Sequence, residues 1–247
     1  MSFLPSSYKM QVHPDFQGFS NFINTVPERI ARQEGSLIYQ GRNEIREIEY
    51  EGVRFVIKSF HRPNLINRFI YGTLRSSKAE RSFHNAMKLL SIGVGTPQPV
   101  AYINMRKNGL FDRSFYISLR SACSHVYNEL FEKHFDYEKE VLQAVGRTTA
   151  ILHENGLAHL DYGRGNILFE KDIDQVRIEL VDLNRMHEGP IGLKAGCKNL
   201  ERLPATPQMH HWLAEAYAEA RHFDVETCFQ LMQAYRSVQP GKIDGKY

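Results

Sequence analysis

The sequence predicts an α+β fold of two lobes, a small antiparallel sheet with one main helix followed by a mainly helical lobe. Alternating apolar residues predict strands in the first half of the chain, most clearly over 53–58. A helical apolar stripe over 77–90 places one helix among these strands. The chain has 247 residues, of which 42% are hydrophobic, enough to form a core in one two-lobed unit.

The first lobe is expected to follow an N-terminal extension, residues 1–33, to which the sequence assigns no role. The lobe itself is predicted over 34–122, with a hinge near 120–124. Its predicted strands lie near 37–40, 45–50, 53–58, 99–104 and 114–119. The stripe on its helix is formed by Phe83, Ala86, Met87 and Leu90.

The second lobe is predicted over 123–247. Asp136 is expected to cap a helix that stops at Asn155-Gly156. Two short strands are expected after it, over 167–169 and 176–180. The last two predicted helices are near 207–221, capped by Thr206, and near 225–236, capped by Asp224.

The segment from His159 to Asn166 has the H-x-D-x-x-x-x-N spacing of a kinase catalytic loop and runs into a strand. In phosphoryl transfer one carboxylate must meet the acceptor hydroxyl, and an amide oxygen must reach a metal beside the phosphates. Asp161 and Asn166 fit these two roles. Asp182 follows the second strand, where kinases place their main magnesium ligand. It begins Asp-Leu-Asn instead of D-F-G, and Asn184 is expected to tolerate the positive φ of that turn.

A cation for the nucleotide phosphates is predicted at Lys58, because Phe55-Val56-Ile57-Lys58 matches the V-A-I-K pattern on a strand. Alternation places Lys58 on the same face as Val56. Glu80 is the expected partner of Lys58, since it is the only acidic residue between Lys58 and Lys88. Gly41 marks the expected phosphate-covering loop, which has one glycine where G-x-G-x-x-G has three and otherwise reads as a hairpin.

Taken together, these motifs resemble the lipopolysaccharide kinase family, relatives of protein kinases that phosphorylate Kdo or heptose in the inner core attached to lipid A. The resemblance covers most of the chain, including Gln40–Asn43, Val56–Lys58, Thr96–Ala101, Leu152–Gly156, the catalytic loop and Leu180–Arg185. It implies a two-lobed protein-kinase-like fold, ATP and Mg²⁺ as cosubstrates and a lipid A-linked sugar acceptor. It also implies a cytoplasmic enzyme at the surface of the inner membrane.

By position, the resemblance gives each site residue a role. Lys58 would hold the α- and β-phosphates in a nucleotide site with Gly41 and Val56, and Glu80 would orient Lys58. Asp161 would be the catalytic base, Asn166 and Asp182 would bind magnesium, and His159 would brace the loop. Gly163 stands where protein kinases carry a phosphate-contacting lysine, and the neighbouring Arg164 is the expected substitute.

The residues after Asp182 bear on the acceptor. Met186 to Pro204 is too short for the activation loop and peptide platform of a protein kinase, which favours a small or lipid-linked acceptor. Two alternatives stay open: a kinase of the same fold acting on protein or a soluble small molecule, and a non-catalytic nucleotide-binding protein.

Charge and cysteines add context. Residues 58–88 hold seven Lys or Arg against one Glu, and apolar residues interleave with the cations, which suits contact of 62–78 with an anionic membrane surface. A solvated face with inward apolar residues is the alternative. No membrane span, signal peptide or nucleic-acid module is expected, and the three isolated cysteines indicate a reducing compartment.

Overall fold

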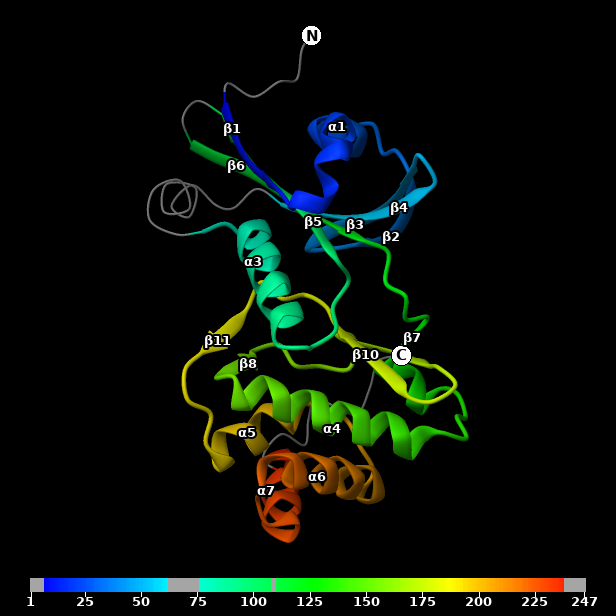
Figure 1. Cartoon of the computed structure of the whole chain (residues 1–247), viewed down its shortest axis with the longest axis vertical. Helices are drawn as coiled ribbons and strands as arrows, with labels where there is room; N and C mark the ends of the chain where they lie inside the picture. Colours follow the sequence, from blue (N-terminus) through cyan, green and yellow to red (C-terminus); the bar gives the residue numbers. More distant parts are fainter. Residues whose placement is uncertain (1–6, 62–75, 108–109, 238–247) are drawn as a thin grey trace. The chain divides into compact units, whose positions relative to one another are not determined.

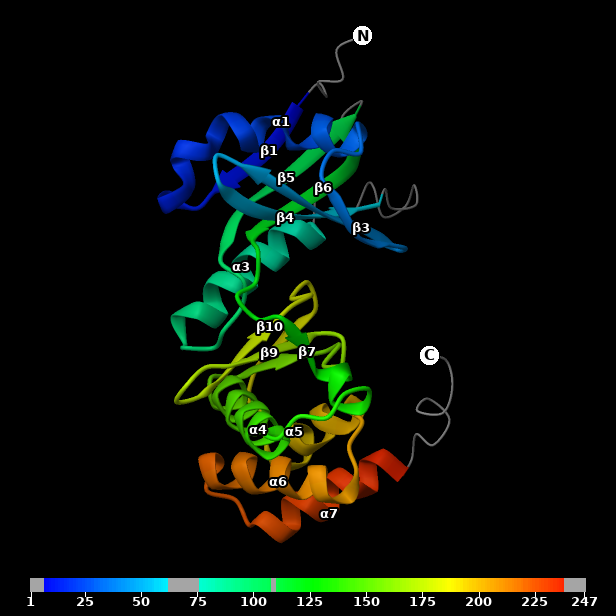
Figure 2. The ribbon, with the colours of Figure 1, turned by 90° about the vertical axis from the view of Figure 1, so that its right-hand side faces the viewer.

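The computed structural model describes residues 7–61, 76–107 and 110–237, which belong to two compact units (Figures 1 and 2). The first unit comprises Met1–Met87 and Pro97–Ser121, and the second comprises Lys88–Thr96 and Ala122–Tyr247. The residues before the first predicted lobe therefore belong to the same unit as its sheet. The predicted combination of helices with an antiparallel sheet is confirmed.

A six-stranded sheet forms the centre of the first unit, in the order β1-β5-β6-β4-β3-β2, and every neighbouring pair is antiparallel. The strands are β1 (Ser7–Val12), β2 (Ser36–Gln40), β3 (Asn43–Tyr50), β4 (Val53–Phe60), β5 (Pro99–Lys107) and β6 (Leu110–Leu119). The five strands expected from the sequence are present. The sixth, β1, pairs along its whole length with β5 and forms one edge of the sheet.

Helix α1 (Ser20–Ala31) covers one face of this sheet after a short 3₁₀ turn, η1 (Pro14–Phe19) (Figure 2). Its buried residues Phe22, Ile23, Val26 and Ile30 recur at helical spacing and share one core with the sheet. The ring centroid of Phe22 lies 4.6 Å from that of Phe55 on β4. The part of the 1–33 extension that forms α1 therefore belongs to the core that supports β4.

Helix α3 (Lys78–Ser91) contributes to a smaller cluster, in which Ala79 and Phe83 pack with Phe60 and Tyr102 of the sheet. Since successive side chains of a strand alternate between faces, Ile57 joins the α1 core while Val56 and Lys58 are on the opposite face of β4. The expected placing of Lys58 with Val56 follows from the same alternation. The basic segment 62–78 falls largely outside the described residues, so the membrane contact stays a prediction.

The second unit is mainly helical, with short strands that frame the loops. Its helices are α4 (Glu138–Glu154), α5 (Leu193–Asn199), α6 (Pro207–Arg221) and α7 (Val225–Ser237), with 3₁₀ turns η2 (Tyr127–Phe131) and η3 (Leu200–Arg202). Its strands are β7 (His125–Val126), β8 (Leu157–His159), β9 (Ile167–Lys171), β10 (Val176–Leu180) and β11 (Met186–Glu188). β10, β9 and β7 form one antiparallel sheet, and β8 pairs with β11.

The helix ends show which cap predictions hold. Thr206 accepts a hydrogen bond from the backbone N–H of Met209, and Asp224 accepts one from Thr227, as expected for the N-caps of α6 and α7. Gly156 has φ +67° directly after α4, which confirms the expected stop. The expected cap at Asp136 is wrong: α4 begins at Glu138 with Tyr137 as its N-cap, and Asp136 lies one residue too early.

Within the described ranges, none of the helices is both long and apolar enough to cross a bilayer. The side chains of Cys123, Cys197 and Cys228 are all buried.

Candidate active site

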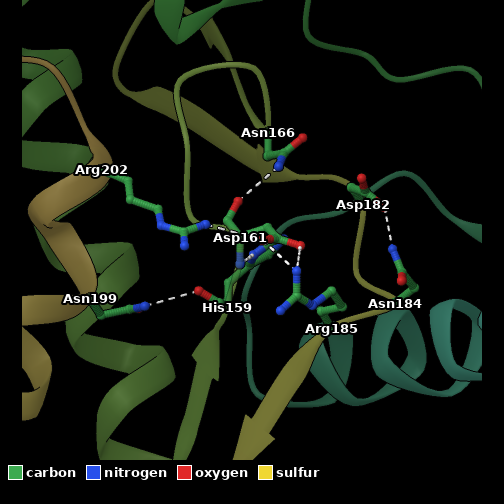
Figure 3. A network of polar contacts seen from close by, with 8 residues as sticks. All are labelled: His159, Asp161, Asn166, Asp182, Asn184, Arg185, Asn199 and Arg202. Carbon is green, nitrogen blue, oxygen red and sulfur yellow. Dashed lines mark hydrogen bonds and ion pairs between the residues drawn. The ribbon is translucent and has the colours of Figure 1, made fainter. Parts of the chain in front are cut away.

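The loop from His159 to Asn166 is held between two strands, β8 ending at His159 and β9 beginning at Ile167. Apolar residues of both strands are buried, among them Leu157, Ile167 and Phe169, so the ends of the loop are anchored in the core. Tyr162, inside the loop, is also fully buried, and its hydroxyl lies 2.8 Å from that of Thr149 on α4. The polar residues Asp161 and Asn166 are thus carried by a loop whose two ends and Tyr162 are anchored in the core (Figure 3).

His159 is the internal brace of this loop and is fully buried. Its Nε2 donates to the carbonyl of Val181 at 3.0 Å, and its Nδ1 accepts from the backbone N–H of Asp161 at 3.1 Å. These partners require the neutral tautomer with the proton on Nε2. Burial lowers the pKa of His159 below its ordinary value, despite the hydrogen bond to Val181 and the nearby carboxylates.

Asn166 holds the loop from its other end. Its side-chain nitrogen Nδ2 donates to the backbone carbonyl of Asp161 at 2.8 Å, and its backbone carbonyl accepts from the N–H of Val181 at 3.0 Å. The side-chain oxygen of Asn166 is directed away from Asp161 (Figure 3). Both the N–H and the carbonyl of Asp161 are therefore hydrogen-bonded, to His159 and Asn166, which limits where its carboxylate can lie.

Two arginines contact the carboxylate of Asp161 (Figure 3). Nη1 of Arg185 lies 3.0 Å from both carboxylate oxygens, and Nη1 of Arg202 lies 3.1 Å from Oδ1. The Asp161 side chain is 28% exposed, whereas those of Arg185 and Arg202 are 58% and 50% exposed. Asp161 is thus accessible and lies beside two solvent-facing cations.

Asp182 follows β10 and has φ +62°, the left-handed conformation. Asn184 donates its amide to Asp182 Oδ1 at 2.5 Å and fixes that carboxylate. The expectation that Asn184 supplies the positive φ of this turn is wrong, because the left-handed residue is Asp182 itself. The side chain of Asn184 has taken a bonding role instead.

The donors in this unit suit magnesium. Carboxylate and amide oxygens such as those of Asp182 and Asn166 are the hard ligands that Mg²⁺ takes, usually with waters and substrate phosphates completing the shell. Across the described ranges no group of three or more His, Cys, Asp and Glu gathers at one point.

In the first unit, Lys58 lies on β4 opposite Ile45 of β3 and Tyr116 of β6. Its ammonium is 5.5 Å from the ring centroid of Phe60, two residues along the same face. Gly41 is at the tip of the β2–β3 hairpin, where its N–H donates to Asn43 and its carbonyl is 3.0 Å from Nε2 of His61. An added Cβ at Gly41 would meet only side-chain atoms of Tyr39, which is 51% exposed and can move aside, so packing alone does not require glycine here.

Glu80 is near the start of α3, with a side chain only 12% exposed. Its carboxylate accepts from the ammonium of Lys9 at 2.6 Å, from Tyr102 at 3.2 Å and from Asn104 at 3.2 Å. Burial would raise the pKa of Glu80, but the bonds and charge of Lys9 outweigh it, and the pKa lies below its ordinary value. The cation found on Glu80 is thus Lys9 of β1, and its pairing with Lys58 stays a prediction.

A second polar chain supports the catalytic loop from the helices. Asn199, the last residue of α5, donates to the carbonyl of His159 at 2.9 Å and accepts from Nε2 of His153 on α4 at 3.1 Å. Nδ1 of His153 accepts from the hydroxyl of Tyr217 at 2.8 Å, and this hydroxyl in turn accepts from Arg221. The helices thereby position the loop through side chains as well as through packing.

Sequence reasoning missed four contact residues: Lys9, Arg185, Asn199 and Arg202. Arg185 and Arg202 are 24 and 41 residues from Asp161, and Lys9 is 71 residues from Glu80. No local pattern links residues at such separations. The signal at hand for Arg185 was its place directly after Asp182-Leu183-Asn184. Arg164 is in the loop, where its carbonyl accepts from the N–H of Asn128, and its phosphate role stays a prediction.

Comparisons with known proteins give the class. The model of the lipopolysaccharide kinase (Kdo/WaaP) family matches residues 38–235. Two curated relatives are 28% identical over 169 residues, 66% of this chain and 69% of theirs. Both are described as 3-deoxy-D-manno-octulosonic acid kinase, from Vibrio vulnificus strains YJ016 and CMCP6.

A solved structure described as WaaP in complex with acyl carrier protein has a TM-score of 0.61 at 17% identity. The match covers 93% of this chain and 98% of that one, and it shows a shared kinase-like fold. Fold and family together define a phosphotransferase with an alcohol group as acceptor. The chain belongs to the lipopolysaccharide kinase (Kdo/WaaP) family.

Proposed function

We propose that this protein transfers the γ-phosphoryl group of ATP to a hydroxyl of Kdo or heptose in the inner core of lipopolysaccharide. The observation that carries the proposal is the catalytic loop, in which His159 and Asn166 fix the main chain of Asp161 and leave its carboxylate accessible. Family membership supports the reaction class, and the two kinases of similar sequence favour Kdo over heptose as the acceptor.

In the reaction, the bond between the γ-phosphorus and the β–γ bridging oxygen breaks, and a bond from the acceptor oxygen to phosphorus forms. Asp161 aligns the hydroxyl and accepts its proton, so that ADP and the phosphorylated sugar leave. Asn166 and Asp182 would hold Mg²⁺, which when bound neutralises charge on the phosphate oxygens. Positioning by the braced loop contributes most of what the protein itself adds.

Lys58 on β4 would hold the α- and β-phosphates, within a nucleotide site that includes Val56 and Gly41. Glu80 would orient Lys58, and Arg164 would take the place of the phosphate-contacting lysine of protein kinases. The support for these assignments is the V-A-I-K-like strand and the hairpin that precedes it.

A lipid A-linked acceptor requires the enzyme to work at a membrane surface, which we place at the cytoplasmic face of the inner membrane. The basic residues of 62–78 would provide peripheral contact with anionic lipid. Binding to vesicles with and without anionic lipid tests this. Charge reversal of Arg62, Arg68 and Arg75 is expected to abolish binding, and unchanged binding would contradict the proposal.

The reaction is tested by incubating the protein with γ-labelled ATP and magnesium, together with Kdo-bearing lipid A, heptose-bearing core or a generic protein. Label is expected on a core glycolipid. Asp161→Asn keeps the size of the side chain and should lower the rate by roughly 10²- to 10⁴-fold, the usual contribution of a general base. Label on the protein alone, or equal labelling by the variant, would refute the proposal.

A further inference from the structure

Building on the proposed function, we propose that Arg185 and Arg202, here called the arginine pair, bind a carboxylate of the sugar acceptor. The pair would thereby select an acidic sugar over a neutral one. This assigns to two residues of the chain the recognition of the acceptor, beyond the transfer of the phosphoryl group itself.

The first support is geometry. Both guanidinium groups contact Asp161, Arg185 at 3.0 Å and Arg202 at 3.1 Å, so any hydroxyl that reaches this carboxylate also comes next to them. They approach from different elements, since Arg185 directly precedes β11 and Arg202 ends η3. Figure 3 shows the two side chains converging on Asp161 from separate directions.

The second support is the count of charges. One carboxylate meets two guanidinium groups, so this contact by itself carries two positive charges and one negative charge. Each arginine uses Nη1 for Asp161, so Nε and Nη2 take no part in these contacts. The planar fork of arginine matches a carboxylate with two parallel hydrogen bonds.

The third support is exposure. More than half of the Arg185 side chain and half of that of Arg202 face solvent, whereas an ion pair whose task is structural gains little at such exposure. By contrast, Arg221 is 6% exposed and has protein partners for all three nitrogens, which is how a structural arginine of this unit is built. The arginine pair is accessible to a ligand.

Two acceptors test the proposal: Kdo-bearing lipid A, and the same molecule with the Kdo carboxyl converted to a primary amide. For the wild type, the amide is expected to lower kcat/KM by roughly 10- to 100-fold, the value of charge-assisted hydrogen bonds. Arg202→Gln should lose a similar factor on the acid and almost none on the amide. Arg202→Lys keeps the charge without the fork and should recover only part of the loss.

A matched control is Arg177→Gln, since Arg177 is 43% exposed and pairs with Asp172 at the β9–β10 turn. It should change neither acceptor's kcat/KM. If Arg202→Gln lowers both acceptors equally, the arginine pair only positions Asp161 and the proposal is overturned. Equal use of acid and amide by the wild type overturns it as well, while leaving the proposed kinase reaction intact.

Binding separates this proposal from the reaction. Calorimetry with free Kdo and its amide should show weaker binding of the amide to the wild type, and no such preference in Arg202→Gln. Preference for the acid without any transfer of label would refute the proposed reaction and sustain the carboxylate site. Neither binding nor transfer would refute both.

Discussion

Stability of the second unit should depend on pH through His153, a residue of α4 that is 2% exposed. Its Nε2 donates to Asn199 and its Nδ1 accepts from Tyr217, an arrangement that only the neutral ring can make. Burial, with the charge of Arg221 adding to it, lowers the pKa of His153 to about 4. Adding a proton to the folded protein is therefore much harder than adding one to the unfolded chain.

The sign and the size of the change in unfolding free energy with pH follow from this pKa. Unfolded His153 titrates near 6.5, so on acidification the unfolded state takes up the proton first and the folded state loses stability. The displacement from 6.5 to about 4 corresponds to about 3 kcal/mol over the whole transition, of which about 2 kcal/mol falls between pH 7 and pH 5. The stabilisation is fully present above pH 6.5 and fully lost below pH 4.

Urea unfolding followed by the fluorescence of Trp212 on α6, the single tryptophan, measures this unit. His153→Gln is the matched variant, because its amide can bond to both neighbours but does not titrate. Between pH 7 and pH 5 the wild type should lose about 2 kcal/mol more than the variant. His159, whose pKa is also lowered, remains in both proteins and cancels. Equal losses would refute the assignment.

Three substitutions test packing and charge elsewhere. Gly196→Ala on α5 places a Cβ 1.9 Å from the Tyr217 hydroxyl and should cost about 1–3 kcal/mol in urea unfolding. Phe22→Ala removes the α1 ring that packs on Phe55 and should cost about 3–5 kcal/mol, seen as a lower Tm. Lys9→Met should cost about 1 kcal/mol, and a double-mutant cycle should show that this cost disappears once Glu80 is glutamine.

Each of these has a control or a contrary result. Gly192→Ala has open space around its Cβ and should be neutral, so an equal loss at Gly192 and Gly196 would contradict the clash. Ile38→Ala removes an exposed apolar side chain and should change the unfolding free energy by less than about 0.5 kcal/mol. Additive effects of Lys9→Met and Glu80→Gln would show that the two residues do not interact.

Most of the helices and strands can be predicted from the sequence, because each of them buries one face and that face carries the apolar residues. Residues 53–58 alternate because Phe55 and Ile57 enter the core shared with α1, and α3 repeats at helical spacing because Ala79 and Phe83 enter the smaller cluster with Phe60 and Tyr102. The pairing of β1 with β5 has no such local signal, since Ser7 pairs with Arg106 and Val12 with Ala101, far along the chain. Likewise Asp136 has the chemistry of a helix cap, but α4 begins at Glu138 and its N-cap is Tyr137, which makes no side-chain capping hydrogen bond.

The candidate site shows the same division. Asp161 and Asn166 are visible because their chemistry requires a fixed spacing within one loop. The arginine pair and Asn199 reach the loop from distant segments, so only the fold reveals them. The positive φ at Asp182 has no signature in the sequence, because aspartate suits a metal ligand as well as the left-handed conformation.

The N-terminal strand bears on how Lys58 could be held. Lys58 is in register with Tyr116, and Tyr116 with Tyr102, whose hydroxyl bonds to Glu80. Lys58, Tyr116 and Tyr102 are thus cross-strand neighbours on β4, β6 and β5. The last of them is hydrogen-bonded to Glu80, the residue expected to orient Lys58. Lys9 is 65% exposed, and ion pairs of such a residue contribute only about 0.2–1 kcal/mol. Because that contribution is small, loss of the Lys9 contact alone should lower the stability of the protein by no more than about 1 kcal/mol. Lys9 precedes the residues that the family model matches, so the cation seen on Glu80 comes from outside the matched region.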